Sequence, residues 1–183
     1  MILFGDNMTW NPNIKLVSGE EHQYYLRTAY NFAWENSEDT VTKTGAVIVR
    51  PYLEQILSYG TNHFPKGVVA TPEQLNDKNW KYEHIIHAEP AAIFSAARKG
   101  ISTDGAVMYM PWVPCTPCAK SIIDAGIKTM IGHKEEIMKT PERWQESTNY
   151  ALSLLEKCGV ELLMYEGQIG EVQNLFNGEI WNP

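Results

Sequence analysis

Four side chains in two short segments could together bind and use a metal ion. The segment HAEPAAI (residues 87–93) carries His87 and Glu89, and the segment PCTPC (residues 114–118) carries Cys115 and Cys118. One neutral imidazole and two thiolates form a tetrahedral ligand set with one open position, which is how catalytic zinc is held. Zinc lowers the pKa of bound water from about 15.7 toward 7, and a nearby carboxylate can transfer the protons. The residue types therefore predict a hydrolytic zinc site with Glu89 as its acid–base group.

Each segment alone also has simpler interpretations. A lone histidine beside apolar residues is commonly a hydrogen-bonded core residue, and Glu89 could simply stabilise a helix N-terminus. A C-x-x-C pair can be a redox pair or half of a four-cysteine zinc site. This chain has no second C-x-x-C pair, however, and prolines flank Cys115 on both sides. The combination H-x-E with P-C-x-x-C resembles the signature of zinc-dependent nucleobase deaminases.

Helix starts are expected to position the four residues. A helix over 87–99 begins at His87, and a helix over 116–125 carries both sulfurs at its first turn, where free N–H groups favour thiolates. The other expected helices cover residues 19–34, opened by a capping box of Ser18 and Glu21, a short segment after the N-cap Thr71, and residues 141–155. Strands are expected over 45–49, 55–60, 106–110, 127–132 and 160–165.

The alternation of strands and helices after an initial hairpin predicts a sheet with helices on both faces. We find no internal repeat or linker, so residues 1–183 are expected to form one domain with a core of about 20–164. The N-terminal arm, residues 1–17, and the polar C-terminal tail, residues 165–183, are expected to pack on this domain or on a neighbouring subunit. Cys158 is expected to be buried as a small apolar side chain.

Charge and composition narrow the partners. The net charge is −7 and the 15 basic residues are scattered, whereas proteins that bind long nucleic acids usually present a basic patch. No segment approaches the roughly 18 apolar residues of a membrane span. The N-terminus MILFGDNM lacks the basic start of a secretory signal. We therefore expect a cytoplasmic protein with a small-molecule substrate, no long nucleic acid and no membrane partner.

Five ordered blocks resemble the cytidine and deoxycytidylate deaminases, and especially the deoxycytidylate (dCMP) branch. They are TKTGAVIV (42–49), GTNHFPKGV (60–68), HAEPAAI (87–93), PWVPCTPCAKSIIDAGI (111–127) and RWQES…CGVEL (143–162). The resemblance implies a three-layer α/β/α sandwich around a five-stranded mixed sheet. It also implies deamination of a cytosine nucleotide, most simply dCMP to dUMP plus ammonia, by one zinc ion per chain in a homo-oligomer.

The same resemblance assigns roles around the zinc ligands His87, Cys115 and Cys118. It implies that Asn62 holds the sugar and that backbone groups near Ala46 and Ala88 meet the pyrimidine edge. Trp112 would line the pocket, although it could equally be core packing. Lys43 and Lys66 are the nearest basic residues in the matching segments for a 5′-phosphate, although both could be solvated surface charges.

The chain also departs from the family pattern. Thr61 and His63 replace a Tyr and a Gly of the turn GTNHFPKGV, which helps to bind dCTP or dTTP in regulated members of the family, so such regulation is not implied here. In addition, Ala91 replaces an Asn and Pro111 a Thr. Some members of the family carry a second, structural zinc on extra Cys and His residues in the segment before the HAE helix. Residues 65–86 of this chain contain only His84 and no cysteine, so the resemblance implies a single zinc ion. Other substrates in the same chemistry are cytidine, CMP, dCTP or a modified base, and tRNA adenosine deaminases share the metal motifs. A nucleotide-binding protein without turnover is the alternative from a different class.

Overall fold

A six-stranded mixed sheet forms the centre of the molecule, in the strand order β1-β6-β5-β4-β2-β3. The structure, a computed structural model, describes residues 14–183, and most of the N-terminal arm lies outside them. The sheet contains β1 (Lys15–Val17), β2 (Gly45–Arg50), β3 (Gln55–Thr61), β4 (Val107–Tyr109), β5 (Thr129–His133) and β6 (Glu161–Tyr165). The helices are α1 (Glu20–Asn36), α2 (Pro72–Asn76), α3 (Lys78–His84), α4 (Ala88–Arg98), α5 (Thr116–Asp124), α6 (Lys134–Ile137) and α7 (Glu142–Lys157). A separate hairpin, β7 (Asn174–Phe176) and β8 (Glu179–Trp181), follows β6.

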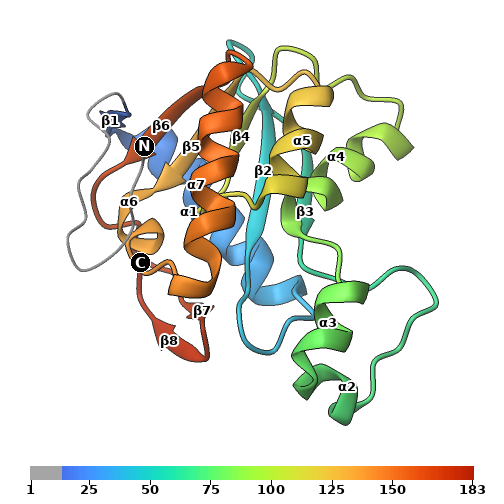
Figure 1. Ribbon diagram of the computed structural model, residues 1–183. Helices are drawn as coiled ribbons and strands as arrows, with labels where there is room; N and C mark the ends of the chain where they lie inside the picture. Colours follow the sequence, from blue (N-terminus) through green and yellow to red (C-terminus); the bar gives the residue numbers. More distant parts are fainter. Residues whose placement is uncertain (1–13) are drawn as a thin grey trace.

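Helices cover both faces of the sheet, as the alternating pattern predicted. Along β2, Val47 and Val49 pack in one hydrophobic cluster with the buried face of α1, whereas Ala46 and Ile48 pack in another with α4, α5 and α7. Successive residues of a strand point to opposite faces, so a strand buried on both sides is apolar throughout. Figure 1 shows α1 behind the sheet and α4, α5 and α7 in front of it. The expected α/β/α sandwich is confirmed.

Three local expectations were wrong. The sheet has six strands rather than five, because Lys15–Val17 adds a short parallel edge strand beside β6. Helix α1 begins after Gly19 without a side-chain cap, so Ser18 and Glu21 form no capping box. Cys158 is exposed because it is the C-cap of α7, where the chain turns toward β6. The expected N-cap Thr71 is confirmed, and it forms a capping box with Gln74.

The sheet topology brings four connecting segments to one edge. Strands β3 and β4 point the same way, since each is antiparallel to β2, and β4, β5 and β6 are parallel. The segments leaving the carboxyl ends of β3, β4 and β5 lead, respectively, into the starts of α4, α5 and α6–α7. The loop entering β2 lies at the same edge, because Gly45 pairs with Thr61. Ligand sites of open α/β sheets lie at such edges.

Gly60 allows α4 to lie unusually close to β3. A Cβ atom at position 60 would lie 2.2 Å from the Ala88 carbonyl oxygen and 2.2 Å from the Ala92 nitrogen. Both atoms belong to the backbone of α4, so neither can move aside as a side chain could. The start of α4, which carries His87 and Glu89, is therefore positioned by the absence of a side chain in β3.

We expect Gly60→Ala to destabilise the protein by about 3 kcal/mol, because overpacking forces backbone shifts. Zinc content should fall with it, since α4 carries a predicted ligand. Chemical denaturation and metal analysis measure both effects. Gly159→Ala is the control: its methyl group would meet no atom within 4 Å, but its φ of 74° should cost about 1–2 kcal/mol. If the two variants lost equal amounts of unfolding free energy, the close approach of α4 to Gly60 would not be the cause.

The C-terminal hairpin is fastened to the body by buried polar and aromatic contacts. The Asn174 amide donates to the Glu136 carboxylate at 2.8 Å, and the Trp181 ring stacks on His133 with an interplanar angle of 7°. Phe176 meets Trp112 edge to face, with ring centroids 5.1 Å apart. The hairpin thus lies against the edge of the sheet at which β3, β4 and β5 end. Among the described residues, no helix is long and apolar enough to cross a membrane.

Candidate active site

The three predicted ligands meet at one point. His87 is the N-cap of α4 and Cys115 is the N-cap of α5, and Cys118 lies in the first turn of α5. The two sulfur atoms are 3.4 Å apart, and the Nδ1 atom of His87 lies 3.5 Å from Cys115 Sγ and 3.4 Å from Cys118 Sγ. His87, which lies 28 and 31 positions before the two cysteines in the sequence, therefore forms a nearly equilateral triangle of donor atoms with them.

This triangle fits zinc. Zn–S distances of about 2.3 Å and Zn–N distances of about 2.0 Å in a tetrahedral site place the ligand atoms about 3.5–3.8 Å apart. The observed separations are within a few tenths of an ångström of that range. The sulfurs are too far apart for a disulfide bond of about 2.05 Å, and both cysteines are free. Two soft thiolates and one imidazole select zinc over hard cations such as Mg²⁺.

The charges of the cluster depend on one another. The hydrogen bond with Cys118 and the adjacent imidazole lower the pKa of Cys115 to about 4. Burial lowers the pKa of His87, but the hydrogen bond to Cys115 and the charges of Glu89 and Cys115 outweigh burial and raise that pKa to about 9. The hydrogen bond with Cys115 raises the pKa of Cys118. A cation bound here must therefore displace the protons of His87 and Cys118, so metal affinity increases with pH.

Glu89 lies beside the triangle and is almost fully buried, with 4% of its surface exposed. It occupies the first turn of α4, two residues after His87. Burial raises the pKa of its carboxyl group to about 7, against the lowering effect of His87. A carboxylate with a pKa near neutrality can both accept and return a proton, as an acid–base catalyst must.

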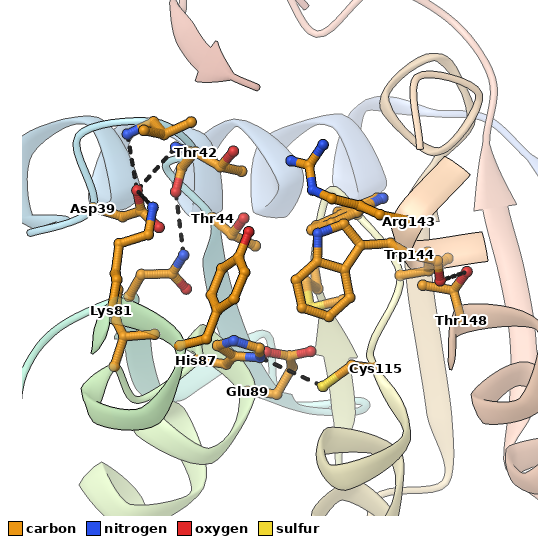
Figure 2. A pocket seen from close by; sticks show the side chains of 17 residues that line it. Asp39, Thr42, Thr44, Lys81, His87, Glu89, Cys115, Arg143, Trp144 and Thr148 are labelled. Carbon is orange, nitrogen blue, oxygen red and sulfur yellow. Dashed lines mark hydrogen bonds and ion pairs between the residues drawn. The ribbon is translucent and has the colours of Figure 1, made fainter. Parts of the chain in front are cut away.

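A pocket opens above the triangle and Glu89. Figure 2 shows His87, Glu89 and Cys115 at one end of it and Arg143 at the other, with the Trp144 ring between them. Aromatic rings form much of the wall: the Trp144 centroid lies 6.3 Å from that of His87, 6.2 Å from that of Trp112 and 5.5 Å from that of Tyr82. Such walls suit a flat heterocycle. The polar lining residues are Asp39, Thr42, Thr44, Asn62, Lys81, Arg143 and Thr148.

A buried ion pair fixes one wall of the pocket. The Lys81 ammonium lies 2.9 Å from the Asp39 carboxylate, and both side chains are under 10% exposed. The same carboxylate oxygen accepts the backbone N–H groups of Val41 at 2.8 Å and Thr42 at 3.2 Å. The loop before β2 is thereby held against α3. Because the charge of Lys81 is balanced by that of Asp39, the pair does little to attract a negatively charged ligand.

Two of the predicted substrate contacts line this pocket. Asn62 is nearly buried, and its amide nitrogen donates to the Thr42 carbonyl at 3.2 Å. That bond leaves the amide oxygen of Asn62 available to accept from a hydroxyl group. Trp112 lines the pocket as well, and its ring N–H donates to the Thr140 hydroxyl at 2.7 Å, which fixes the ring orientation.

The other four predicted contacts do not line it. Ala46 and Ala88 are completely buried in the core cluster. The expected contact was with backbone groups near them, and it stays a prediction; Thr44 and His87, close to them in the sequence, do line the pocket. The Lys43 ammonium donates to the backbone carbonyls of Trp34 and Ser37, away from the pocket. Lys66 lines a different cavity, on the outer side of β3. Matching segments placed these residues near the site, but a segment does not specify where a long side chain points.

Sequence reasoning missed Asp39, Lys81, Arg143 and Trp144 as pocket residues. Arg143 and Trp144 belong to the RWQES block, which contributed only to the resemblance. Both lie at the start of α7, and the segment from β5 into α7 leaves the same sheet edge as the starts of α4 and α5. Counting which helix starts share this edge would have indicated them. The Asp39–Lys81 pair joins residues 42 positions apart, for which the sequence holds no local signal.

An α/β/α sandwich with a His-Cys-Cys triangle and a carboxylate at two helix starts defines the zinc-binding deaminase fold class. Residues 19–134 match the family model described as the cytidine and deoxycytidylate deaminase zinc-binding region. The chain therefore belongs to the cytidine and deoxycytidylate deaminase family, and its metal is zinc.

Individual relatives extend this comparison. The deoxycytidylate deaminase of Enterobacteria phage T2 is 31% identical over 122 residues, which cover 67% of this chain and 60% of that relative. ComE operon protein 2 of Bacillus subtilis is 32% identical over 79% of this chain and 71% of its own length. The dCMP deaminase of cyanophage S-TIM5, solved with dCMP and dUMP, superposes with a TM-score of 0.61 at 26% identity over 78% of this chain and 94% of that one. The chain spans 60% and 58% of the lengths of the phage T2 and T4 deaminases.

Proposed function

We propose that this protein hydrolyses dCMP to dUMP and ammonia. The observation that carries the proposal is the buried Glu89 carboxylate beside the His-Cys-Cys triangle. It lies at one end of a pocket whose other end is lined by the Arg143 guanidinium. A binding protein without turnover has no use for an acid–base group in that position. The names of the phage T2 relative and of the cyanophage structure support the choice of dCMP.

The chemistry divides between the metal and Glu89. Zinc held by His87, Cys115 and Cys118 supplies Lewis acidity, which makes water easier to deprotonate at neutral pH. Glu89 accepts a proton from the attacking water and delivers it to ring N3 as oxygen adds to C4. It then transfers the second water proton to the exocyclic amine, so that the C4–N bond breaks and ammonia leaves. One water is consumed, and the carboxylate returns to its starting state.

Aromatic rings and one amide orient the rest of the nucleotide. The rings of Trp112 and Trp144 are perpendicular, with an interplanar angle of 90°, and form two adjoining walls above the triangle. We assign Asn62 to the sugar, because its amide nitrogen is already bonded to Thr42 and its oxygen remains available for a hydroxyl hydrogen.

Arg143 is the group we assign to the 5′-phosphate. Its hydrogen-bond partner is the neutral side-chain oxygen of Asn177, and no carboxylate of the described residues forms an ion pair with it. Lys81, the other long cation in the lining, is paired with Asp39. A guanidinium binds phosphate through two parallel N–H bonds. Its position at the end of the pocket opposite Glu89 suits a phosphate one sugar away from the reacting base.

Replacing Arg143 tests the substrate assignment. Arg143→Met should raise the KM for dCMP about 30-fold, because a bidentate charge-assisted contact is lost. It should leave turnover of deoxycytidine, which has no phosphate, unchanged. Lys66→Met is the matched control, because it removes an exposed cation outside the pocket and should change neither value. Ammonia release is measured with dCMP, CMP, dCTP, cytidine and deoxycytidine. A wild-type preference for cytidine or dCTP, or a KM effect in Lys66→Met alone, would contradict the assignment.

We also propose that the protein forms a homo-oligomer. The second cavity, beside β3 and α4, is surrounded by Phe32, Tyr59 and Phe94, of which Phe94 is 54% exposed. Exposed aromatic side chains around one concave surface are typical of subunit contacts. Light scattering after size-exclusion chromatography should give a mass of two or more times that of the 20.8 kDa chain. A monomer at micromolar concentration would contradict this proposal.

The thiolate ligands support a cytoplasmic location. Cys115 and Cys118 must stay reduced to bind zinc, and their sulfurs are close enough that a small rotation would allow a disulfide bond. A compartment kept reducing by glutathione and thioredoxin protects such a pair. Fractionation of cells that express the tagged protein tests this location.

A further inference from the structure

The turn of the C-terminal hairpin touches two separate parts of the pocket wall. Asn177 lies in that turn, between β7 and β8. Its side-chain oxygen accepts a hydrogen bond of 2.8 Å from the Arg143 guanidinium, and its backbone N–H donates to the Thr42 hydroxyl oxygen at 3.1 Å. Flanking backbone bonds, from Gly178 to the Val41 carbonyl and from Lys43 to the Leu175 carbonyl, attach the turn to the same loop.

We propose that Asn177 is a positioning residue that arranges Arg143 and Thr42 as a pair of donors for the substrate phosphate. The proposal rests on the function proposed above. Neither bond uses a group that a phosphate would need. The Thr42 oxygen accepts from Asn177, so its own hydroxyl hydrogen is free to donate into the pocket it lines. The guanidinium has five N–H donors and gives one of its nitrogens to Asn177.

A neutral partner is the chemically suitable one. A carboxylate in place of the Asn177 amide would also hold the guanidinium, but it would neutralise the charge that attracts the phosphate. Arg143 is exposed, and an unrestrained arginine loses about 2 kcal/mol of side-chain entropy when it is fixed. A neutral acceptor removes part of this cost before the ligand arrives and leaves the positive charge available.

The backbone conformation at this position restricts which residues can serve. Asn177 has a φ of 53°, in the left-handed region that asparagine tolerates better than most side chains. Glycine adopts the same conformation freely, and aspartate tolerates it too. Asn177→Gly therefore removes the side-chain acceptor, and Asn177→Asp gives it a negative charge. Both changes keep the turn and its backbone hydrogen bond to Thr42.

The experiment compares dCMP with deoxycytidine in both variants of the full chain. Asn177→Gly should raise the KM for dCMP about five- to tenfold with kcat unchanged, because one hydrogen bond to a charged group is lost. Asn177→Asp should raise it about another tenfold, because the carboxylate pairs with Arg143 and repels the phosphate. The kcat/KM for deoxycytidine should stay at the wild-type value in both. Glu179→Gln, an exposed change in the same hairpin, is the control and should alter neither substrate.

The outcomes separate the positioning role from a structural one. A merely structural role would lower activity toward dCMP and deoxycytidine together, with lower thermal stability, and would overturn the proposal. An unchanged KM for dCMP in Asn177→Asp would overturn it too. A wild-type protein that binds dUMP but does not deaminate dCMP would overturn the proposed function and this inference with it. If the wild-type protein deaminates dCMP and both Asn177 variants have the wild-type KM for dCMP, this inference alone would be overturned.

Discussion

Glu89→Gln should abolish dCMP turnover while leaving the zinc in place. The change preserves the size of the side chain and removes the group that transfers protons, so kcat should fall by about 10³-fold or more. Metal content should stay at one zinc per chain, because Glu89 is not part of the ligand triangle. The variant should stay folded, because the amide has the size of the buried carboxylate that it replaces.

Single-turnover kinetics and elemental analysis of the same Glu89→Gln sample check this expectation. A nucleotide-binding assay with dUMP serves as the control, because the pocket and its zinc are expected to remain intact. Turnover within tenfold of the wild-type rate would remove Glu89 from the mechanism. Loss of zinc would instead show that the carboxylate helps to hold the metal.

Cys115→Ala should lose both the metal and much of the stability. Because the site exists in the folded protein and not in the unfolded chain, the free energy of zinc binding adds to the free energy of folding. A structural zinc site in peptides contributes about 10–16 kcal/mol at pH 7. Removing one of three ligands leaves an imidazole and a single thiolate, too few to keep zinc tightly. The midpoint of thermal unfolding should fall by more than 10 °C, because even a few kcal/mol shifts the midpoint that far in a domain of this size.

Cys158→Ala is the matched control for the loss of a thiol. Cys158 is exposed at the end of α7 and belongs to no cluster of potential ligands among the described residues. Its replacement should change neither zinc content nor the unfolding midpoint. A fully folded, zinc-loaded Cys115→Ala protein would show that the ligand assignment is wrong. Chelation of the wild-type protein should reproduce the Cys115→Ala unfolding curve.

The fold and the metal ligands could be predicted because their signals are local. Apolar periodicity marks strands such as β2 and helices such as α5, and the residues at helix starts follow from them. His87 and Cys115 were recognisable because each opens a helix within a short motif. The short edge strand β1 was missed because three residues carry no periodicity that distinguishes a strand from a loop.

The substrate contacts were predicted less well because they depend on side-chain direction and long-range pairing. Lys43 lies in a segment next to the pocket, yet its ammonium binds carbonyls at the end of α1. Arg143 lies 100 residues further along the chain and enters the pocket from α7. The bond between Arg143 and Asn177 joins a helix start to a hairpin that the sequence did not reveal. Motifs identify residues that act together in a short segment, but not those that meet only after folding.

The metal ligands and the substrate contacts are held by different kinds of structure. His87 and Cys115 begin helices whose facing surfaces consist of small buried residues such as Ala88, Ala92 and Ala119, so the spacing of the donor atoms is set by close packing in the core. Thr42, Arg143 and Asn177 lie on a loop, an exposed helix start and a turn, where replacements disturb little else. Substrate preference could therefore diverge during evolution by changes at the rim, while the reaction chemistry is inherited unaltered.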